Sequence, residues 1–173
     1  AGRRARGGGG NQRERMMTDR VVAHPAARAR QTVVVLGGTG FVGSALCRQL
    51  ASHGHWQVVV VTRDRKRAES LAGLSHVVVE EADVFDVDAL GRLLGKADAV
   101  VNLIAILHGD SQQFHRVHIK LPEQLARECR QRGDVRLVHV SALGVDSPGD
   151  SAYLQSKAWG ERLMRETWPG TTV

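Results

Sequence analysis

Aromatic residues are scarce in this chain of 173 residues, where they account for 4% of the total. The three tryptophans are scattered along the sequence, so they form no platform on which the bases of a nucleic acid could stack. Long apolar runs are also missing, and none approaches the roughly 18 residues that a membrane-spanning helix needs. We therefore predict neither nucleic-acid binding nor a transmembrane segment.

Cysteine is equally rare, with only Cys47 and Cys129, each inside a helical pattern and far apart in sequence. This predicts buried, reduced thiols of a cytosolic-type compartment rather than a disulfide framework. Three histidines, His108, His115 and His118, cluster in sequence, but no cysteine or carboxylate accompanies them at a spacing typical of metal ligands. We therefore predict no metal site.

The formal net charge of +6 is confined to the start of the chain. Residues 1–30 contain eight arginines against Glu14 and Asp19, so 8 − 2 = +6, whereas residues 31–173 contain 16 basic and 16 acidic side chains. The part of the chain with a globular composition is thus neutral, and the charge does not favour a nucleic-acid partner.

Residues 1–30 contain four consecutive glycines, many arginines and no apolar periodicity. Such a segment buries too little surface to offset the entropy of ordering, so we expect a disordered basic leader. Three origins remain open: a translation artefact upstream of a start at Met16 or Met17, a basic arm, or an Arg-rich organelle transit segment. The first is favoured, because a transit segment should be amphipathic.

From residue 31 onward, short β-branched runs alternate with longer amphipathic segments, which is typical of repeated βαβ units around a parallel sheet. The predicted strands span residues 32–36, 57–61, 76–80, 99–104 and 136–141. The predicted helices span residues 42–52, 67–71, 87–94, 113–132 and 152–167, and Gly54, Gly95 and Gly133 stand where a C-cap favours positive φ. Right-handed crossovers then give an α/β Rossmann fold with the strand order 3-2-1-4-5.

The last three residues, 171–173, resemble the start of a sixth strand. We therefore expect residues 31–173 to form a single Rossmann domain that is incomplete at its C-terminal side. The portion that would follow should shape most of any substrate pocket, and the identity of the substrate is not readable from the sequence.

A glycine-rich turn joins the first predicted strand to the first helix. It reads Gly37, Gly38, Thr39, Gly40, Phe41, Val42, Gly43. Gly37 would permit a tight turn, Gly40 would let the backbone approach a diphosphate, and Gly43 would allow close packing of helix and strand. No Lys-Ser/Thr pair follows the glycines, which argues against a P-loop and favours a dinucleotide over ATP. A tight turn without a ligand remains the alternative.

Two further positions bear on the cofactor. Arg63 stands at the end of the second strand, where a guanidinium suits a 2′-phosphate, so NADP is favoured over NAD. Asp64 keeps NAD open, and a solvated charge run is the alternative for this segment. Asp83 and Val84 follow the third strand, where the carboxylate could accept a hydrogen bond from an adenine amino group or serve as a loop acid.

Tyr153 is the only tyrosine, and Lys157 lies four residues later in the same predicted helix. The two side chains should share a face, and a nearby ammonium favours the phenolate of a tyrosine. Such a pair can move a proton to or from a substrate oxygen while a nicotinamide moves hydride, and Lys157 can also bind the cofactor through the hydroxyls of the nicotinamide ribose. The alternative is an exposed helix face, since this spacing is common by chance.

Taken together, GGTGFVG, Asp83-Val84, HVSALG and YLQSK resemble the atypical, extended short-chain dehydrogenases/reductases of the NAD-dependent epimerase/dehydratase superfamily. AVVNLIAILHG, FHRVHIKLP and YLQSKAWGERLMRETWPG are most similar to the nucleotide-binding accessory subunits of respiratory complex I and their bacterial relatives. The resemblance covers residues 32–173.

The resemblance implies a dinucleotide at the glycine turn and Arg63, with Tyr153 and Lys157 as active-site residues and Ser141 as a doubtful third. In the complex I subunits the cofactor is thought to be structural, so an oxidoreductase or epimerase and a structural or assembly subunit both remain open. It further implies a bacterial cytoplasmic protein, with attachment to the inner membrane left open, or a matrix protein in a eukaryote. Ser141 stands early, and His118 replaces a common asparagine, which weakens the case for efficient turnover.

Overall fold

The computed structural model describes residue 2 and residues 30–173, so the predicted leader lies almost entirely outside the described residues. From residue 31 the chain forms a six-stranded parallel sheet with the order β3-β2-β1-β4-β5-β6. The strands are β1 (Gln31–Leu36), β2 (Trp56–Thr62), β3 (Val77–Glu81), β4 (Ala99–Asn102), β5 (Arg136–His139) and β6 (Thr171–Thr172). The α/β Rossmann prediction and its strand order are confirmed, and β6 extends the sheet by the predicted sixth strand.

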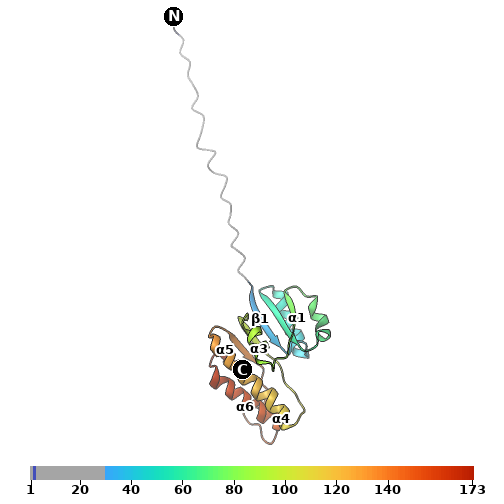
Figure 1. Cartoon of the computed structure of the whole chain (residues 1–173), viewed down its shortest axis with the longest axis vertical. Helices are drawn as coiled ribbons and strands as arrows, with labels where there is room; N and C mark the ends of the chain where they lie inside the picture. The colour runs from blue at the N-terminus through green and yellow to red at the C-terminus, as the bar shows by residue number, and fades with distance from the viewer. Residues whose placement is uncertain (1, 3–29) are drawn as a thin grey trace.

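The helices cover both faces of this sheet (Figure 1). They are α1 (Phe41–His53), the 3₁₀ segment η1 (Arg65–Ala68), α2 (Glu69–Ala72), α3 (Val87–Leu94), α4 (Ser111–Phe114), the π-helical segment η2 (His115–Lys120), α5 (Leu121–Arg132) and α6 (Ala152–Thr167). All ten predicted strands and helices are present, with ends within two residues of those predicted.

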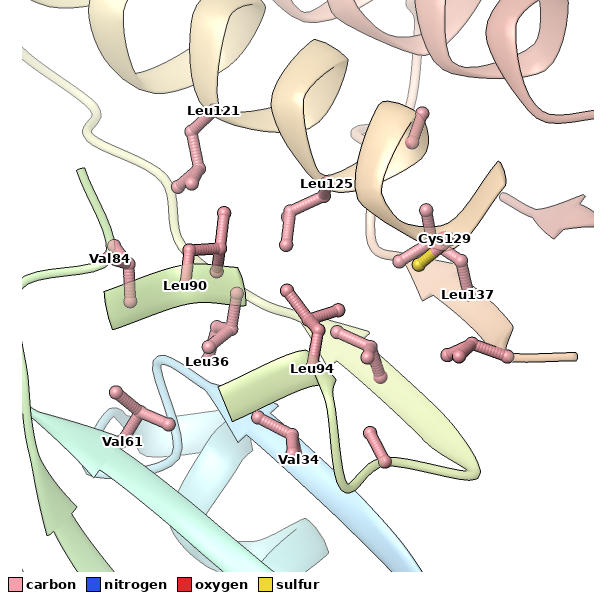
Figure 2. Packing of buried hydrophobic residues seen from close by; sticks show 14 of the residues in the cluster. Val34, Leu36, Val61, Val84, Leu90, Leu94, Leu121, Leu125, Cys129 and Leu137 are labelled. Carbon is pink, nitrogen blue, oxygen red and sulfur yellow. The ribbon is translucent and has the colours of Figure 1, made fainter. Parts of the chain in front are cut away.

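Two apolar clusters lie on opposite faces of the sheet because successive side chains of a strand point in opposite directions. Val34 and Leu36 of β1 pack under α3, α5 and α6, as the close-up in Figure 2 shows for the first two of these helices. Val33 and Val35 pack with Cys47 of α1 on the other face. This two-sided burial explains why β1 is a continuous valine run rather than an alternating one.

Both cysteines are buried free thiols, Cys47 in one cluster and Cys129 in the other. Burial raises the pKa of Cys47 to about 11 and that of Cys129 to about 12, so neither is a reactive thiolate at neutral pH. The prediction that both thiols are buried is confirmed, and they lie in different clusters.

The glycines at the helix ends behave differently from one another. Gly54 and Gly133 adopt the predicted left-handed conformation, with φ of 68° and 75°. The prediction for Gly95 is wrong, because its φ is −53° and its N–H donates to the carbonyl of Gly91, which continues the helical pattern. Gly95 therefore marks the end of α3 without adopting the left-handed conformation.

The long helix predicted over 113–132 begins earlier and is interrupted. Asp110 caps it through a capping box with Gln113, so the helix starts at residue 111. Residues His115–Lys120 then form a π-helical turn before α5 resumes. Such turns often mark functional sites, and this one carries the buried His118.

Strands β4 and β5 end two residues earlier than predicted, at Asn102 and His139. The two residues are paired in the register of the parallel strands, so they lie side by side on one face of the sheet. Beyond Asn102 the chain leaves the sheet as a loop over residues 103–110. This edge, formed by the carboxyl ends of the strands, is where ligands bind in open α/β sheets.

None of the helices within residues 30–173 combines the length and apolarity that crossing a bilayer would demand. Within the same residues, no three histidine, cysteine or acidic side chains gather closely enough to hold a metal ion. His108 and His115 are exposed, whereas His118 is buried and takes part in the hydrogen bonds described below.

Candidate functional site

The glycine turn closes on itself at the end of β1. Gly37 has a φ of 78°, which a residue with a side chain rarely adopts, and its carbonyl accepts a hydrogen bond of 3.0 Å from the N–H of Gly40. A side chain at Gly43 would overlap the backbone of Gly37 and Gly38. The close approach that Gly43 permits is therefore to the turn itself, rather than to the strand as the sequence suggested.

Gly38 and Gly40 differ in what surrounds them. A Cβ at Gly38 would lie 3.0 Å from Val60 and 3.2 Å from the Sγ of Cys47, so this glycine is required by packing within the protein. A Cβ at Gly40 would meet only the carbonyl oxygen of Gly37, at 3.2 Å, and otherwise faces open space. Packing within the described residues therefore restricts Gly40 through this one contact, and a ligand close to the backbone would be a second reason for a glycine here.

Helix α1 begins at this turn with its first N–H groups unclaimed by a side-chain cap. Gly40 is the N-cap residue, and the first turn carries no acidic side chain. Phe41 and Val42 are 95% and 59% exposed, so they leave the helix start open to solvent. Free N–H groups and the positive end of the helix dipole together suit a diphosphate.

A cavity of about 580 Å³ runs along the strand ends from the glycine turn. It is lined by Gly37, Thr39 and Gly40 of the turn, by Val61, Thr62, Arg63, Asp64 and Arg67 after β2, by Ala82, Val84 and Phe85 after β3, and by Leu103, Ile104 and Ala105 after β4. Its size falls in the range of small-molecule sites. Of the predicted cofactor residues, the structure brings Gly37, Thr39, Gly40, Arg63 and Val84 to one cavity, whereas Gly38, Phe41, Val42 and Gly43 are not part of its lining.

The charged side chains after β2 are divided between the cavity and the protein. Asp64 accepts a hydrogen bond from the N–H of Lys66 and caps η1, while Arg65 bonds the carbonyl of Val79. Arg63 and Arg67 line the cavity and are exposed. The sequence prediction missed Arg67, and the only signal for it was its place in the charged run that follows β2.

Asp83 lies beside this cavity but is not part of its lining. Its Oδ1 accepts a hydrogen bond of 3.1 Å from the N–H of Phe85 and so shapes the loop after β3. Val84, which is buried, and Phe85 line the cavity instead. The adenine contact predicted for Asp83 stays a prediction.

Helix α6 positions Tyr153 and Lys157 one turn apart, and Ser151 caps its start by accepting from the N–H of Leu154. Tyr153 is half-buried, with its ring edge against His118 at 5.4 Å and Phe114 at 6.4 Å between centroids. Lys157 is only 1% exposed. The alternative of an exposed helix face is therefore wrong for Lys157.

The amine of Lys157 lies among neutral polar groups. Its Nζ donates to the carbonyl of Val140 at 2.8 Å and lies 3.3 Å from the Nε2 of His139. The other ring nitrogen of His139 lies 3.1 Å from the Nδ2 of Asn102, whose Oδ1 accepts from the N–H of Ile104. Loss of hydration lowers the pKa of Lys157 to about 8, with Glu161 acting in the opposite direction.

His118 connects the loop after β4 to α6. Its Nε2 accepts from the N–H of Ile106 at 3.1 Å, so its proton resides on Nδ1 and is donated to the Oγ of Ser156 at 2.8 Å. Ser156 in turn donates to the carbonyl of Tyr153. Burial, and then the positive charge of Lys157, lowers the pKa of His118 to about 4, so the ring is neutral near pH 7.

His139 is the most strongly perturbed histidine among the described residues. Burial, followed by the charges of Lys157 and His118, lowers its pKa to about 3. Two neutral histidines and one buried lysine therefore surround the start of α6. Sequence reasoning missed Asn102, His139 and Ser156 as parts of this site, because their proximity depends on the β4–β5 register and on the packing of η2 against α6.

Ser141 lies just beyond β5, and its Oγ is buried with no hydrogen-bond partner among the described residues. An unpaired buried hydroxyl is costly unless another group meets it. The role predicted for Ser141 beside Tyr153 and Lys157 stays a prediction.

The loop of residues 103–106 lies between the cavity and this polar network. Leu103, Ile104 and Ala105 line the cavity, while the N–H groups of Ile104 and Ile106 are held by Asn102 and His118. The same segment therefore forms a wall of the cavity and is fixed by the network around Lys157.

Comparison with known proteins shows which family the sequence matches. The family model described as "NAD dependent epimerase/dehydratase family" matches residues 33–166. The chain is 31% identical over 146 residues to the NADH-ubiquinone oxidoreductase 40 kDa subunit of Neurospora crassa, covering 82% of this chain and 39% of that protein. It is 30% identical over 149 residues to the ceramide reductase of Caulobacter vibrioides, covering 86% of this chain and 46% of that protein. The chain thus spans less than half the length of these relatives.

Solved structures share the fold. UDP-glucuronic acid 4-epimerase from Bacillus cereus in complex with NAD matches with a TM-score of 0.70 and 24% identity, over 79% of this chain and 51% of that one. dTDP-glucose 4,6-dehydratase from Bacillus anthracis in complex with NAD matches with a TM-score of 0.67 and 18% identity, over 82% and 53%. At such identities the likeness shows the fold alone.

Proposed function

Since this chain belongs to the NAD-dependent epimerase/dehydratase family, we propose that it binds NADP(H) along the carboxyl edge of its sheet and supports reduction of a carbonyl or oxidation of a hydroxyl. The observation that carries the proposal is Gly40. Apart from the carbonyl oxygen of Gly37 at 3.2 Å, a Cβ at Gly40 would meet no atom of the described residues, and the helix start beside it has no side-chain cap, so a bare backbone here would admit a ligand.

The residues of the cavity suit the parts of a dinucleotide. The glycine turn and the first turn of α1 would hold the diphosphate, and the loop at Asp83 and Val84 would border the adenine. Arg63 and Arg67 line the cavity together with Asp64, whose Oδ1 accepts from the N–H of Lys66, and the two arginines would lie at the adenosine ribose. Two exposed guanidinium groups beside one carboxylate favour a 2′-phosphate, and hence NADP over NAD.

The bound cofactor would supply a nicotinamide that gives or takes a hydride at the reacting carbon. Tyr153 would donate the matching proton to a carbonyl oxygen, or take it from a hydroxyl, through its phenol. Lys157, one turn along α6, would act on the proton affinity of Tyr153, and the unpaired Oγ of Ser141 could be met by the substrate oxygen.

A second candidate function is a non-catalytic one. The similarity to complex I subunits of Neurospora crassa and Arabidopsis thaliana, the latter at 33% identity over 145 residues, favours a subunit that binds NADP(H) to stabilise its own fold. As such a subunit, the protein would lie beside other subunits of a respiratory complex. The hydrogen bonds that hold the amine of Lys157 within the protein are compatible with it.

Cofactor titration and turnover separate the two candidates. The protein is titrated with NADPH and NADH by calorimetry, and hydride transfer to carbonyl acceptors is then followed by loss of reduced-cofactor absorbance. Loss of turnover with retained binding in Tyr153→Phe supports the reductase, and tight binding without turnover in both proteins supports the structural subunit. Absence of binding for both cofactors would reject the whole proposal.

A further inference from the structure

Strand β3 lies at one end of the sheet, and within residues 30–173 no strand pairs with its outer side. The carbonyl of His76, which precedes β3, and the N–H of Ala82, which follows it, both bond to β2. Since successive backbone groups of a strand point to opposite sides, the even-numbered residues of β3 face β2 and the odd-numbered ones face outward. The outer edge therefore presents the N–H and C=O groups of three residues, Val77, Val79 and Glu81.

This edge suits pairing with a second copy of the chain. β3 begins with three consecutive valines, a residue type that favours strands. If two edges met antiparallel about Val79, each Val79 would donate to the carbonyl of the other. Val77 would then lie opposite Glu81 of the second copy, and Val78 would lie opposite Glu80. No two like charges would face each other directly across the pair, so charge does not oppose it.

Arg65 of η1 lies across the centre of this edge. Its Nη2 donates to the carbonyl of Val79 at 2.9 Å, and its Nε lies 3.9 Å from the carboxylate of Glu81. The guanidinium thus takes the acceptor on which the antiparallel pair would be centred. The Arg65 side chain is 64% exposed, so it also places a hydrated charge where a second strand would lie. At the start of the strand, the N–H of Val77 donates to the carbonyl of Leu74 at 3.3 Å.

We propose that the outer edge of β3 is a self-association surface and that Arg65 blocks it. Withdrawal of both arginines, one from each copy, would free the two Val79 carbonyls and join two sheets edge to edge about a twofold axis. Arg65 is not part of the cavity lining, whereas Arg63 and Arg67 are. The arginines that follow β2 are thus divided between two tasks, and the blocking of the edge is independent of NADP(H) binding.

Arg65→Met tests the proposal in the full chain, because methionine preserves the length of the side chain and cannot donate a hydrogen bond. We expect it to dimerise about 10- to 100-fold more tightly than the wild type, since each copy loses one competing hydrogen bond. Sedimentation velocity over a series of concentrations measures the association. Lys66→Met is the matched control, because Lys66 is exposed and removes the same charge from the same segment.

Cross-linking identifies the surface that associates. A mixture of two Arg65→Met proteins, one with Val78→Cys and the other with Glu80→Cys, should form disulfide-linked dimers faster than either protein alone, because these positions oppose each other in the antiparallel pair. The native cysteines, Cys47 and Cys129, are buried and do not compete.

A third variant tests the backbone pairing itself. Adding Val79→Pro to Arg65→Met should restore the monomer, because proline lacks the N–H that the central pair requires. An edge strand accepts proline where the N–H faces outward, and circular dichroism checks that the fold is retained. A folded Arg65→Met protein that stays monomeric would overturn the proposal, and lower stability alone would mean that Arg65 only anchors η1 to β3. Equal association of Lys66→Met, or association without the mixed cross-link, would also overturn it.

Discussion

Gly160 of α6 packs directly against the backbone carbonyl of His118 in η2, and no side chain fits between the two segments. The contact fixes how closely α6, which carries Tyr153 and Lys157, approaches the π-helical turn. The ring of His118 then reaches Ser156 and Tyr153 across the same interface. A glycine far from the nucleotide turn thus helps to position the candidate active-site residues.

The first prediction concerns this contact. Gly160→Ala should destabilise the protein by about 3 kcal/mol or more, because the new methyl group overlaps the carbonyl of His118 and forces the helices apart. Urea unfolding measures the change in the free energy of unfolding. The Lys157 titration should also shift toward its ordinary pKa, since separation of the helices admits water.

Gly91→Ala is the matched control, because Gly91 lies within α3 and a Cβ there would meet only the Oε2 of Glu128, at 3.9 Å. Alanine costs less backbone entropy than glycine in a helix, so this variant should be neutral or more stable by up to about 1 kcal/mol. Equal effects of the two substitutions would show that the approach of α6 to His118 is not close.

The second prediction separates two glycines of the nucleotide turn. Gly43→Ala should unfold or strongly destabilise the protein, because its methyl group would overlap the backbone of Gly37 and Gly38. Gly40→Ala meets only the carbonyl oxygen of Gly37, at 3.2 Å, so it should fold and lose much less stability than Gly43→Ala, yet bind NADP(H) at least about tenfold more weakly because its methyl group lies beside the proposed diphosphate. Thermal unfolding and calorimetric titration measure the two effects. Undiminished binding by Gly40→Ala would contradict the proposed position of the diphosphate.

Local patterns were sufficient to predict much of this fold. The valine runs of β1 and β2 predicted strands buried on both faces, and Gly37, whose φ is positive, was identified from its place between strand and helix. These features depend on a few neighbouring residues and on steric rules that hold in any protein. The cavity beside the glycine turn was therefore predictable in outline.

Long-range register was not predictable in the same way. Asn102 and His139 are 37 residues apart, and only the β4–β5 register brings them together. The π-helical turn adds a residue to a helical repeat that appears regular in sequence, and so directs His118 inward. Gly95 also shows that a glycine at the end of a helix need not adopt a positive φ.

The third prediction tests cofactor choice. Replacing Arg63 and Arg67 together with alanine should weaken NADPH binding by about 10- to 100-fold and leave NADH binding within about twofold, because only the 2′-phosphate loses its partners. Arg65→Ala is the control, since Arg65 bonds Val79 and lies 3.9 Å from Glu81. Equal losses for both cofactors would mean that the arginines do not recognise a 2′-phosphate.

The last prediction concerns acid stability. His118 is held neutral in the folded protein, and its pKa falls from 6.5 to about 4, so the stability linked to this ring is complete above pH 6.5 and is lost as the pH falls toward 4. Between these values, unfolding takes up one proton at this site, which contributes a slope of about 1.4 kcal/mol per pH unit. The total contribution of His118 is then about 3 kcal/mol.

His118→Asn removes this titration, so the plot of unfolding free energy against pH should flatten by about that slope between pH 6 and pH 4.5. Comparing slopes avoids any constant loss of stability that the substitution causes. His139 contributes in the same direction in both proteins, because its pKa is lowered to about 3. His115→Asn, at an exposed position in the same segment, should leave the slope unchanged. Parallel curves for His118→Asn and the wild type would show that unfolding takes up no proton at His118, so that the ring is already charged in the folded protein. A charged ring has no free nitrogen to accept a hydrogen bond from the N–H of Ile106, so the assigned bond would be wrong.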